Sequence, residues 1–179
     1  FAAREEPPPL AHAGAIVLRR LAGLVLLGGG AAGLLLAFGR NPLAYGLQVP
    51  PWDISLLWIG GATVIATPIL LRKGRSADTQ THYPELGVLG WRPGIRVLSA
   101  LCWALFLLGY EFLFRGAMLF ELRDAWGDTL ALAVVTALYA LAHWRHGWGE
   151  IVACVPLGLV FGLMTLQTDA FWPAWATHL

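Results

Sequence analysis

The chain has 179 residues, of which 58% are apolar and 13% charged, and twelve Lys and Arg against eleven Asp and Glu give a formal net charge of +1. Ordinary soluble domains have roughly 45–50% apolar and about 25% charged residues, so this chain has too few charges to cover a soluble surface. The composition therefore excludes an ordinary soluble domain and indicates a protein in lipid, and the small net charge gives no reason to expect a nucleic acid as partner.

Residues 1–14 are expected to form a water-exposed, proline-rich lead-in. They include Glu5, Glu6 and the run Pro7-Pro8-Pro9, which favours an extended polyproline conformation. The membrane-embedded part of the chain is therefore expected to begin at residue 15.

Two membrane spans and a basic loop are predicted within residues 15–96. Residues 21–38 and 54–71 are apolar runs close to the about 20 residues that a membrane-spanning helix needs. The stretch from Arg72 to Arg96 is polar and carries five basic residues, so the positive-inside rule places it on the cytoplasmic side. Beyond residue 96, the basic residues do not consistently indicate which side of the membrane each connection occupies.

Further apolar segments are predicted in residues 97–179, and none shows strand-period alternation or a repeat. Because backbone polar groups in lipid must be satisfied within the spanning segment, these runs are expected to be helices. The fold class is therefore an all-α, polytopic transmembrane helical bundle of about six membrane segments. The C-terminal segments cover residues 97–120, 130–143 and 151–166 and a run that starts near Phe171.

Two pairs of glycines are spaced as Gly-x-x-x-Gly, a pattern that lets membrane helices pack closely. The first pair is Gly29 and Gly33 in the first span, and the second is Gly158 and Gly162 in the fifth. Each pair predicts a close contact with a neighbouring helix.

Glu111 and Arg115 form the first notable polar pair inside an apolar segment. They are four residues apart and therefore share one face of the predicted helix. In lipid neither side chain can stay charged without a partner, so we expect them to pair with each other. An ion pair that only positions the helix and a functional site both account for this arrangement.

Other ionisable residues lie in separate apolar segments. Tyr139 and His143 are four apart on the last turn of the fourth segment, and His178 lies in the sixth. Because three segments each bring an ionisable group to membrane depth, packing alone is a poor explanation, and these groups are expected to be functional. Glu150 is at the start of the fifth segment. It is either a functional residue or an acid that stabilises the helix N-terminus.

These motifs, in this order, resemble the CPBP superfamily, which includes the type II CAAX prenyl proteases and many bacterial relatives. The resemblance covers about residues 109–179 and is carried by Glu111-Phe-Leu-Phe-Arg115-Gly116, by Tyr139-x-x-x-His143 and by His178. It implies that residues 97–179 form the catalytic core and that the motif residues face a shared intramembrane cavity.

The chain departs from the family pattern at two positions. Tyr110 stands where the family has a first glutamate, the residue to which the resemblance assigns activation of water, and Tyr139 stands where it has phenylalanine. A bacterial subset has a single glutamate here and a further glutamate after the second-motif histidine, as Glu111 and Glu150 do. The resemblance then implies that Glu111 or Glu150 is the base, in a protein of the bacterial cytoplasmic (inner) membrane.

The function that this resemblance implies is intramembrane endopeptidase. Glu111 and His143 would activate a water that attacks a peptide carbonyl, and His178 would donate a hydrogen bond to the developing oxyanion. The expected partners are the lipid bilayer and a membrane-proximal peptide or protein segment, with no cofactor and no metal.

Three alternatives compete with this hypothesis. The histidines and glutamates could hold zinc in a zinc-dependent intramembrane protease, although the chain has no His-Glu-x-x-His pair. The same polar cluster could belong to a non-catalytic membrane scaffold or peptide-binding protein, which Tyr110 favours. A transporter or proton relay is the third, and no inverted repeat with broken helices supports it.

Overall fold

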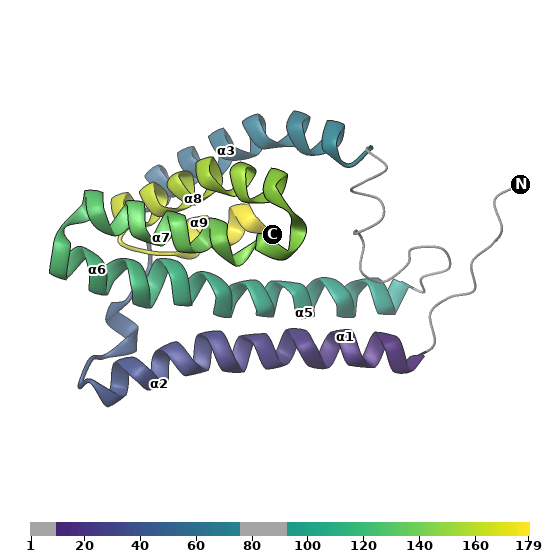
Figure 1. Ribbon diagram of the computed structural model, residues 1–179, viewed down its shortest axis with the longest axis horizontal. Helices are drawn as coiled ribbons and strands as arrows, with labels where there is room; N and C mark the ends of the chain where they lie inside the picture. The colour runs from purple at the N-terminus through teal and green to yellow at the C-terminus, as the bar shows by residue number, and fades with distance from the viewer. Residues whose placement is uncertain (1–9, 76–92) are drawn as a thin grey trace, which may run out of the picture.

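The computed structural model describes residues 10–75 and 93–179, and this part of the chain consists of helices and their connections, without strands. The long helices lie side by side, and each runs opposite to the one before it in the chain (Figure 1). The all-α membrane bundle is thereby confirmed. The first nine residues of the predicted lead-in and residues 76–92 of the predicted basic loop lie outside the described residues.

Among the described residues, four helical segments are long and apolar enough to cross a membrane. The first is made by α1 (Leu10–Gly23), the π-helix η1 (Leu24–Gly29) and α2 (Gly30–Ala37), and the second by α3 (Trp52–Lys73). The third is made by α5 (Pro93–Glu111), the π-helix η3 (Phe112–Met118) and α6 (Leu119–Trp126), and the fourth by α8 (Trp148–Thr168).

The other two predicted segments are also helical. Helix α7 (Asp128–Ala142) has 15 residues and α9 (Trp172–His178) has 7. Helix α9 packs against α3, α5 and α8, which places His178 within the bundle. Short 3-10 turns, η2 (Pro42–Ala44) and η4 (Trp144–His146), lie in the connections.

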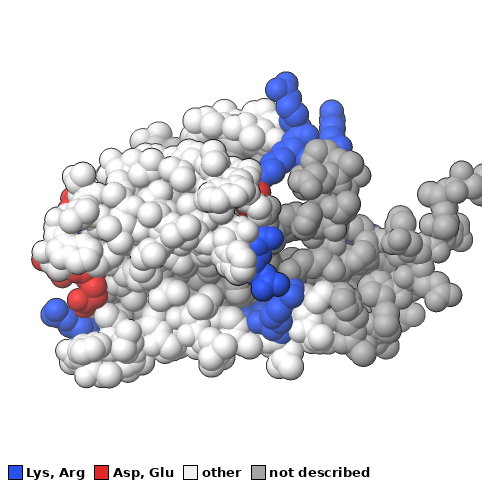
Figure 2. Space-filling model, in the orientation of Figure 1, with Lys and Arg blue, Asp and Glu red and all other residues white. Residues whose placement is uncertain are grey.

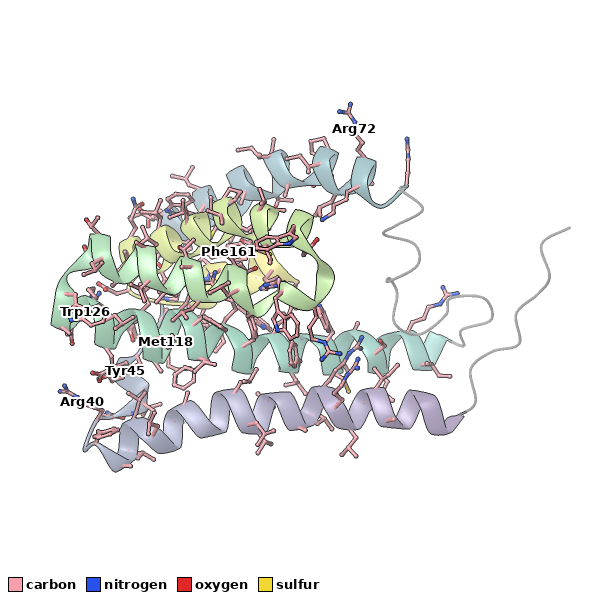
Figure 3. The ribbon with its side chains drawn as sticks, in the orientation of Figure 1. Arg40, Tyr45, Arg72, Met118, Trp126 and Phe161 are labelled. Carbon is pink, nitrogen blue, oxygen red and sulfur yellow. The ribbon has the colours of Figure 1, made fainter. Side chains whose placement is uncertain are left out.

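Basic residues collect at one end of the bundle. Figure 2 shows Lys and Arg gathered where α3 finishes, and Figure 3 places Arg72 at this end and Arg40 and Tyr45 at the other. At the opposite end, Arg40 and Arg123 are paired with acids: Arg40 Nε lies 3.2 Å from Glu121 Oε1, and Arg123 Nη1 lies 2.9 Å from Asp169 Oδ1. Among the described residues, positive charge is therefore concentrated at the α3 C-terminal end, which the positive-inside rule would place on the cytoplasmic side.

For the protein in the membrane that bounds the cell, this orientation predicts which surface positions react from outside. Leu43 and Trp144 lie at opposite ends of the bundle and are 68% and 66% exposed. With a membrane-impermeant thiol reagent on intact cells, we expect labelling of Leu43→Cys, and of Trp144→Cys only after the cells are opened. The reverse pattern would contradict the assignment, and the unsubstituted protein, whose two cysteines are buried, is the control.

Only one of the two predicted glycine pairs makes close helix contacts. A Cβ on Gly158 would lie 3.1 Å from both Thr136 and Tyr139 of α7, whereas a Cβ on Gly29 or Gly33 would meet nothing within 4 Å. The prediction for the first pair is therefore wrong. Gly28 makes the close approach instead, because the wider turns of the π-helix η1 change which residues face α5.

The crossing of η1 with α5 depends on glycine on both helices. A Cβ on Gly109 would lie 2.9 Å from Leu24 Cα and 3.0 Å from the Leu24 carbonyl oxygen, which are backbone atoms that cannot rotate away. We expect Gly109→Ala to lower the free energy of unfolding by about 1–3 kcal/mol, as overpacking does. Thermal unfolding in detergent measures it, with Gly33→Ala as matched control, and equal effects of the two substitutions would contradict the crossing.

Candidate active site

The third span changes from α-helix to π-helix at the predicted polar pair. Glu111 is the last residue of α5, and Arg115 lies in η3, the kind of π-helical insertion that is frequent at functional sites. Both side chains are 0% exposed, and Arg115 Nε lies 3.4 Å from Glu111 Oε2. The predicted pairing is thus confirmed, and the two opposite charges are fully buried in the structure.

The Arg115 guanidinium is enclosed by aromatic rings. Its central carbon lies 4.1 Å from the ring centre of Tyr139, 5.5 Å from that of Phe161 and 5.8 Å from that of Phe114. None of its nitrogens has a hydrogen-bond partner among the described residues. The cation is therefore stabilised by the Glu111 carboxylate and by the negative faces of the rings, which also fix its position.

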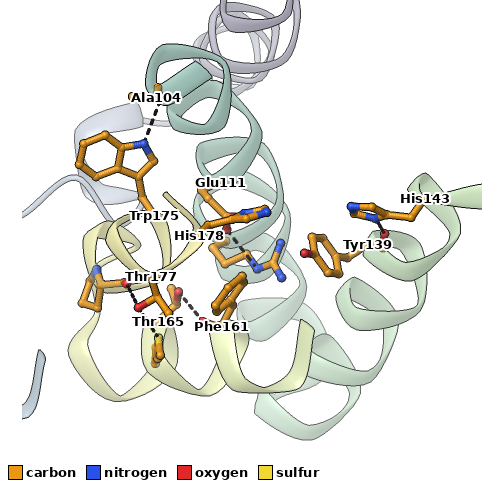
Figure 4. Close-up of polar contacts among 12 residues, drawn as sticks. Ala104, Glu111, Tyr139, His143, Phe161, Thr165, Trp175, Thr177 and His178 are labelled. Atoms are coloured by element: carbon orange, nitrogen blue, oxygen red, sulfur yellow. Dashed lines mark hydrogen bonds and ion pairs between the residues drawn. The ribbon is translucent and has the colours of Figure 1, made fainter. Parts of the chain in front are cut away.

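His178 completes a contact between residues far apart in the sequence. Its Nδ1 lies 2.6 Å from Glu111 Oε1, and its side chain is 21% exposed. Figure 4 shows His178 beside Glu111, with Tyr139 and His143 approaching from α7. The structure therefore brings together two of the predicted site residues in one carboxylate–imidazole pair.

Tryptophan side chains anchor the short helix that carries His178. Trp175 Nε1 donates to the carbonyl oxygen of Ala104 in α5 at 3.0 Å, and Trp172 Nε1 donates to that of Leu47 at 3.2 Å. Sequence reasoning missed this role. The two tryptophans around Pro173 in this apolar run could have indicated it. An indole whose ring is buried needs a hydrogen-bond acceptor for its N–H group.

His143 lies at the C-terminal end of α7, where its ring contacts a backbone carbonyl of the same helix. Its Nδ1 lies 2.9 Å from the carbonyl oxygen of Tyr139, which can only accept, so Nδ1 carries a hydrogen and Nε2 has the lone pair in the neutral ring. The Tyr139 ring lies 4.9 Å from that of His143 and also covers Arg115. Tyr139 thus separates the buried cation from the second histidine.

Tyr110, which the CPBP resemblance places at the position of a first glutamate, lies between the two histidines. Its ring centre is 6.3 Å from that of His143 and 6.2 Å from that of His178. Its ring also lies 4.7 Å from that of Phe114, and its buried hydroxyl has no hydrogen-bond partner among the described residues. Tyr110 therefore keeps the place of a site residue although its chemistry is not that of glutamate.

A cavity of about 1150 Å³ adjoins this cluster. Its wall is mostly apolar and is formed by α1, α3, α5, α7, α8 and α9. The polar residues that line it are Arg19, Arg20, Lys73, Tyr110, Tyr139, His143, Glu150, Gln167, Thr177 and His178. Three of the predicted site residues, His143, Glu150 and His178, thus share one cavity. Glu111 and Arg115 lie behind this wall.

Glu150 has a different partner from Glu111. It lies in the first turn of α8, and its Oε2 is 2.6 Å from Lys73 Nζ at the end of α3. The pair joins α3 to α8 at the basic end of the cavity. The two glutamates of the predicted site therefore occupy separate electrostatic environments.

The zinc hypothesis requires at least three ligands near one point. Within residues 10–75 and 93–179, as far as their side chains are described, no group of three or more His, Cys, Asp or Glu is arranged to hold a metal ion. The side chain of His146 lies outside the described part. The pair formed by Glu111 and His178 is thus two ligands where a structural or catalytic zinc site has three or four.

The fold and the site together define a polytopic membrane protein with a buried carboxylate–imidazole pair beside an intramembrane cavity. Residues 95–179 match the family model described as type II CAAX prenyl endopeptidase Rce1-like. This region, which runs from α5 through α9, is similar to that family of membrane endopeptidases, in agreement with the CPBP resemblance. No curated protein and no solved structure matched the chain.

Proposed function

We propose that this protein is an intramembrane endopeptidase that cleaves a membrane-associated peptide or protein segment by means of a water activated at the glutamate–histidine site. The observation that carries the proposal is the contact of 2.6 Å between His178 Nδ1 and the buried carboxylate of Glu111, next to a cavity that His143 also lines. A carboxylate and imidazoles held in this way can remove a proton from water and polarise a carbonyl group.

Arg115 supports this chemistry by stabilising the ionised form of Glu111. An isolated carboxylate in a low-dielectric interior would be neutralised, because its desolvation penalty is large. The guanidinium 3.4 Å away compensates for part of that penalty. We assign Arg115 to holding the charge of Glu111 rather than to contact with substrate, because its side chain is fully buried.

The cavity favours an apolar, membrane-embedded substrate. Its lining on α3 extends from Ile54 to Lys73, which corresponds to roughly 28 Å along the helix and approaches the thickness of the hydrocarbon core. A segment lying in this cavity would be in contact with apolar side chains over most of its length. Glu150, the alternative base, is better suited to joining α3 to α8 through Lys73.

The cleavage activity can be tested on the membrane proteins of a producing cell. Newly formed N-termini are labelled in membranes from cells that make the native protein and from cells that make Glu111→Gln. We expect a set of N-termini that is present with the native protein and absent with Glu111→Gln. Asp124→Asn, in an exposed side chain of α6, is the control and should retain the set. Identical sets from the native protein and Glu111→Gln would overturn the proposal.

A non-catalytic peptide-binding protein is the second candidate, and Tyr110 is the observation that favours it, because the family's first glutamate is missing. Such a protein would yield no N-termini that depend on Glu111. The same comparison therefore separates the two functions.

A further inference from the structure

The carboxylate of Glu111 lies where a water in the cavity has poor access to it. Its side chain is 0% exposed, its Oε1 is engaged by His178 Nδ1 at 2.6 Å, and its Oε2 faces Arg115 Nε at 3.4 Å. A general base must come within about 2.6–3.2 Å of the group whose proton it removes, or act through one water. Glu111 is therefore badly placed to take a proton from the attacking water itself.

His178 has the contacts that a base in this cavity needs. Its side chain is 21% exposed and lines the cavity, while Nδ1 is held by the carboxylate of Glu111. A carboxylate can only accept, so Nδ1 carries a hydrogen, and in the neutral ring the lone pair then belongs to Nε2. The contact with Glu111 thus selects the tautomer in which the second nitrogen can accept a proton.

The His178 ring is fixed in this orientation by its surroundings. The centre of the His178 ring lies 5.3 Å from that of Phe161, which is labelled in Figure 4, and 6.2 Å from that of Tyr110. The helix that carries His178 is anchored by the hydrogen bond from the Trp175 indole to the carbonyl oxygen of Ala104. A base that is held by its neighbours before the substrate arrives needs little reorganisation during the reaction.

From this geometry we infer that His178 is the general base of the proposed protease and that Glu111 is a positioning residue that acts through it, an assignment that rests on the proposed function. Nε2 of His178 takes a proton from water as the water oxygen bonds to the peptide carbonyl carbon and the carbonyl electron pair moves to its oxygen. The C–N bond then breaks, and the imidazolium returns the proton to the departing nitrogen, which leaves a carboxyl group and an amine.

This assignment differs from the one that the sequence predicts, in which Glu111 is the base and His178 donates to the oxyanion. The arrangement is that of a carboxylate that orients an imidazole and stabilises it when it is protonated, without itself accepting the proton. It also accounts for Tyr110, because a site whose base is an imidazole does not need a glutamate at that position.

The test compares His178→Ala, Glu111→Gln and the double variant on the peptide bond that the native protein cleaves, with and without added imidazole. We expect His178→Ala to lower the cleavage rate about 10²–10⁴-fold, as loss of a general base does. Added imidazole should enter the cavity and raise the rate of His178→Ala at least about tenfold. Glu111→Gln should cause little further loss in the His178→Ala background, because a positioning residue has no effect once its partner is gone.

Three results would overturn the assignment. They are a His178→Ala rate within tenfold of the native rate, no response of this variant to imidazole, or a further loss of about 10²-fold or more from Glu111→Gln in the double variant. His178→Asn, which keeps a polar side chain beside Glu111, serves if the alanine variant does not fold. Absence of any cleavage by the native protein would instead overturn the proposed function, so the two failures are distinct.

Discussion

Arg115→Met is expected to lower the free energy of unfolding by about 3–5 kcal/mol, the cost of leaving a buried charge without its partner. Arg115 is fully buried, and its removal leaves Glu111 with His178 as its remaining polar contact. The lost contacts to the rings of Tyr139 and Phe161 add to the effect. Unfolding of the purified protein in mixed micelles would measure the change.

A double variant tests whether the charge pair is the cause. If Arg115→Met acts by exposing Glu111 to an apolar environment, then Glu111→Gln should recover part of the loss, and the two substitutions should couple by about 0.5–3 kcal/mol. Additive effects would contradict the buried pair. Arg123→Met, on a side chain that is 28% exposed and also paired with acids, is the matched control and should change stability by under about 1 kcal/mol.

His143→Ala is expected to lower the cleavage rate by about 10²–10⁴-fold while leaving the protein folded. His143 lines the cavity and is half-buried, and its Nδ1 is bonded to the carbonyl oxygen of Tyr139 within the same helix end. Its loss should therefore affect the reaction far more than the packing. The rate at the bond cleaved by the native protein and the thermal unfolding temperature would be measured together.

The neighbouring tryptophan provides the control for this variant. Trp144 is 66% exposed, so Trp144→Ala removes a large side chain at the same helix end without touching the cavity wall. It should retain cleavage. If Trp144→Ala and His143→Ala reduce the rate equally, the effect is one of local structure, and His143 has no part in the chemistry.

The sequence by itself determined the fold class and the candidate residues for the site. Apolar runs of membrane length predict helices, because lipid offers no hydrogen-bond partners and the backbone groups must bond to one another within the segment. Residues such as Glu111 and Arg115 are recognisable at membrane depth because an ionisable group there is costly without a function or a partner. For the same reason the sequence alone identifies His143 and His178 as candidates.

Only the tertiary structure decided which of these residues are partners. The pairing of His178 with Glu111 joins residues that are 67 positions apart, and no local spacing predicts it. Gly28, rather than Gly29 or Gly33, lies at the helix crossing, within the π-helix η1, where a wider turn changes the face that a residue occupies.

The two glutamates illustrate the same division. In the sequence Glu111 and Glu150 are equivalent candidates for the base, since each is a carboxylate in or beside an apolar run. In the structure Glu150 pairs with Lys73 at the end of the bundle, whereas Glu111 is enclosed with Arg115 and His178. The reactivity of a carboxylate depends on the charges and the solvent around it, and those are set by helices that meet only when the chain has folded.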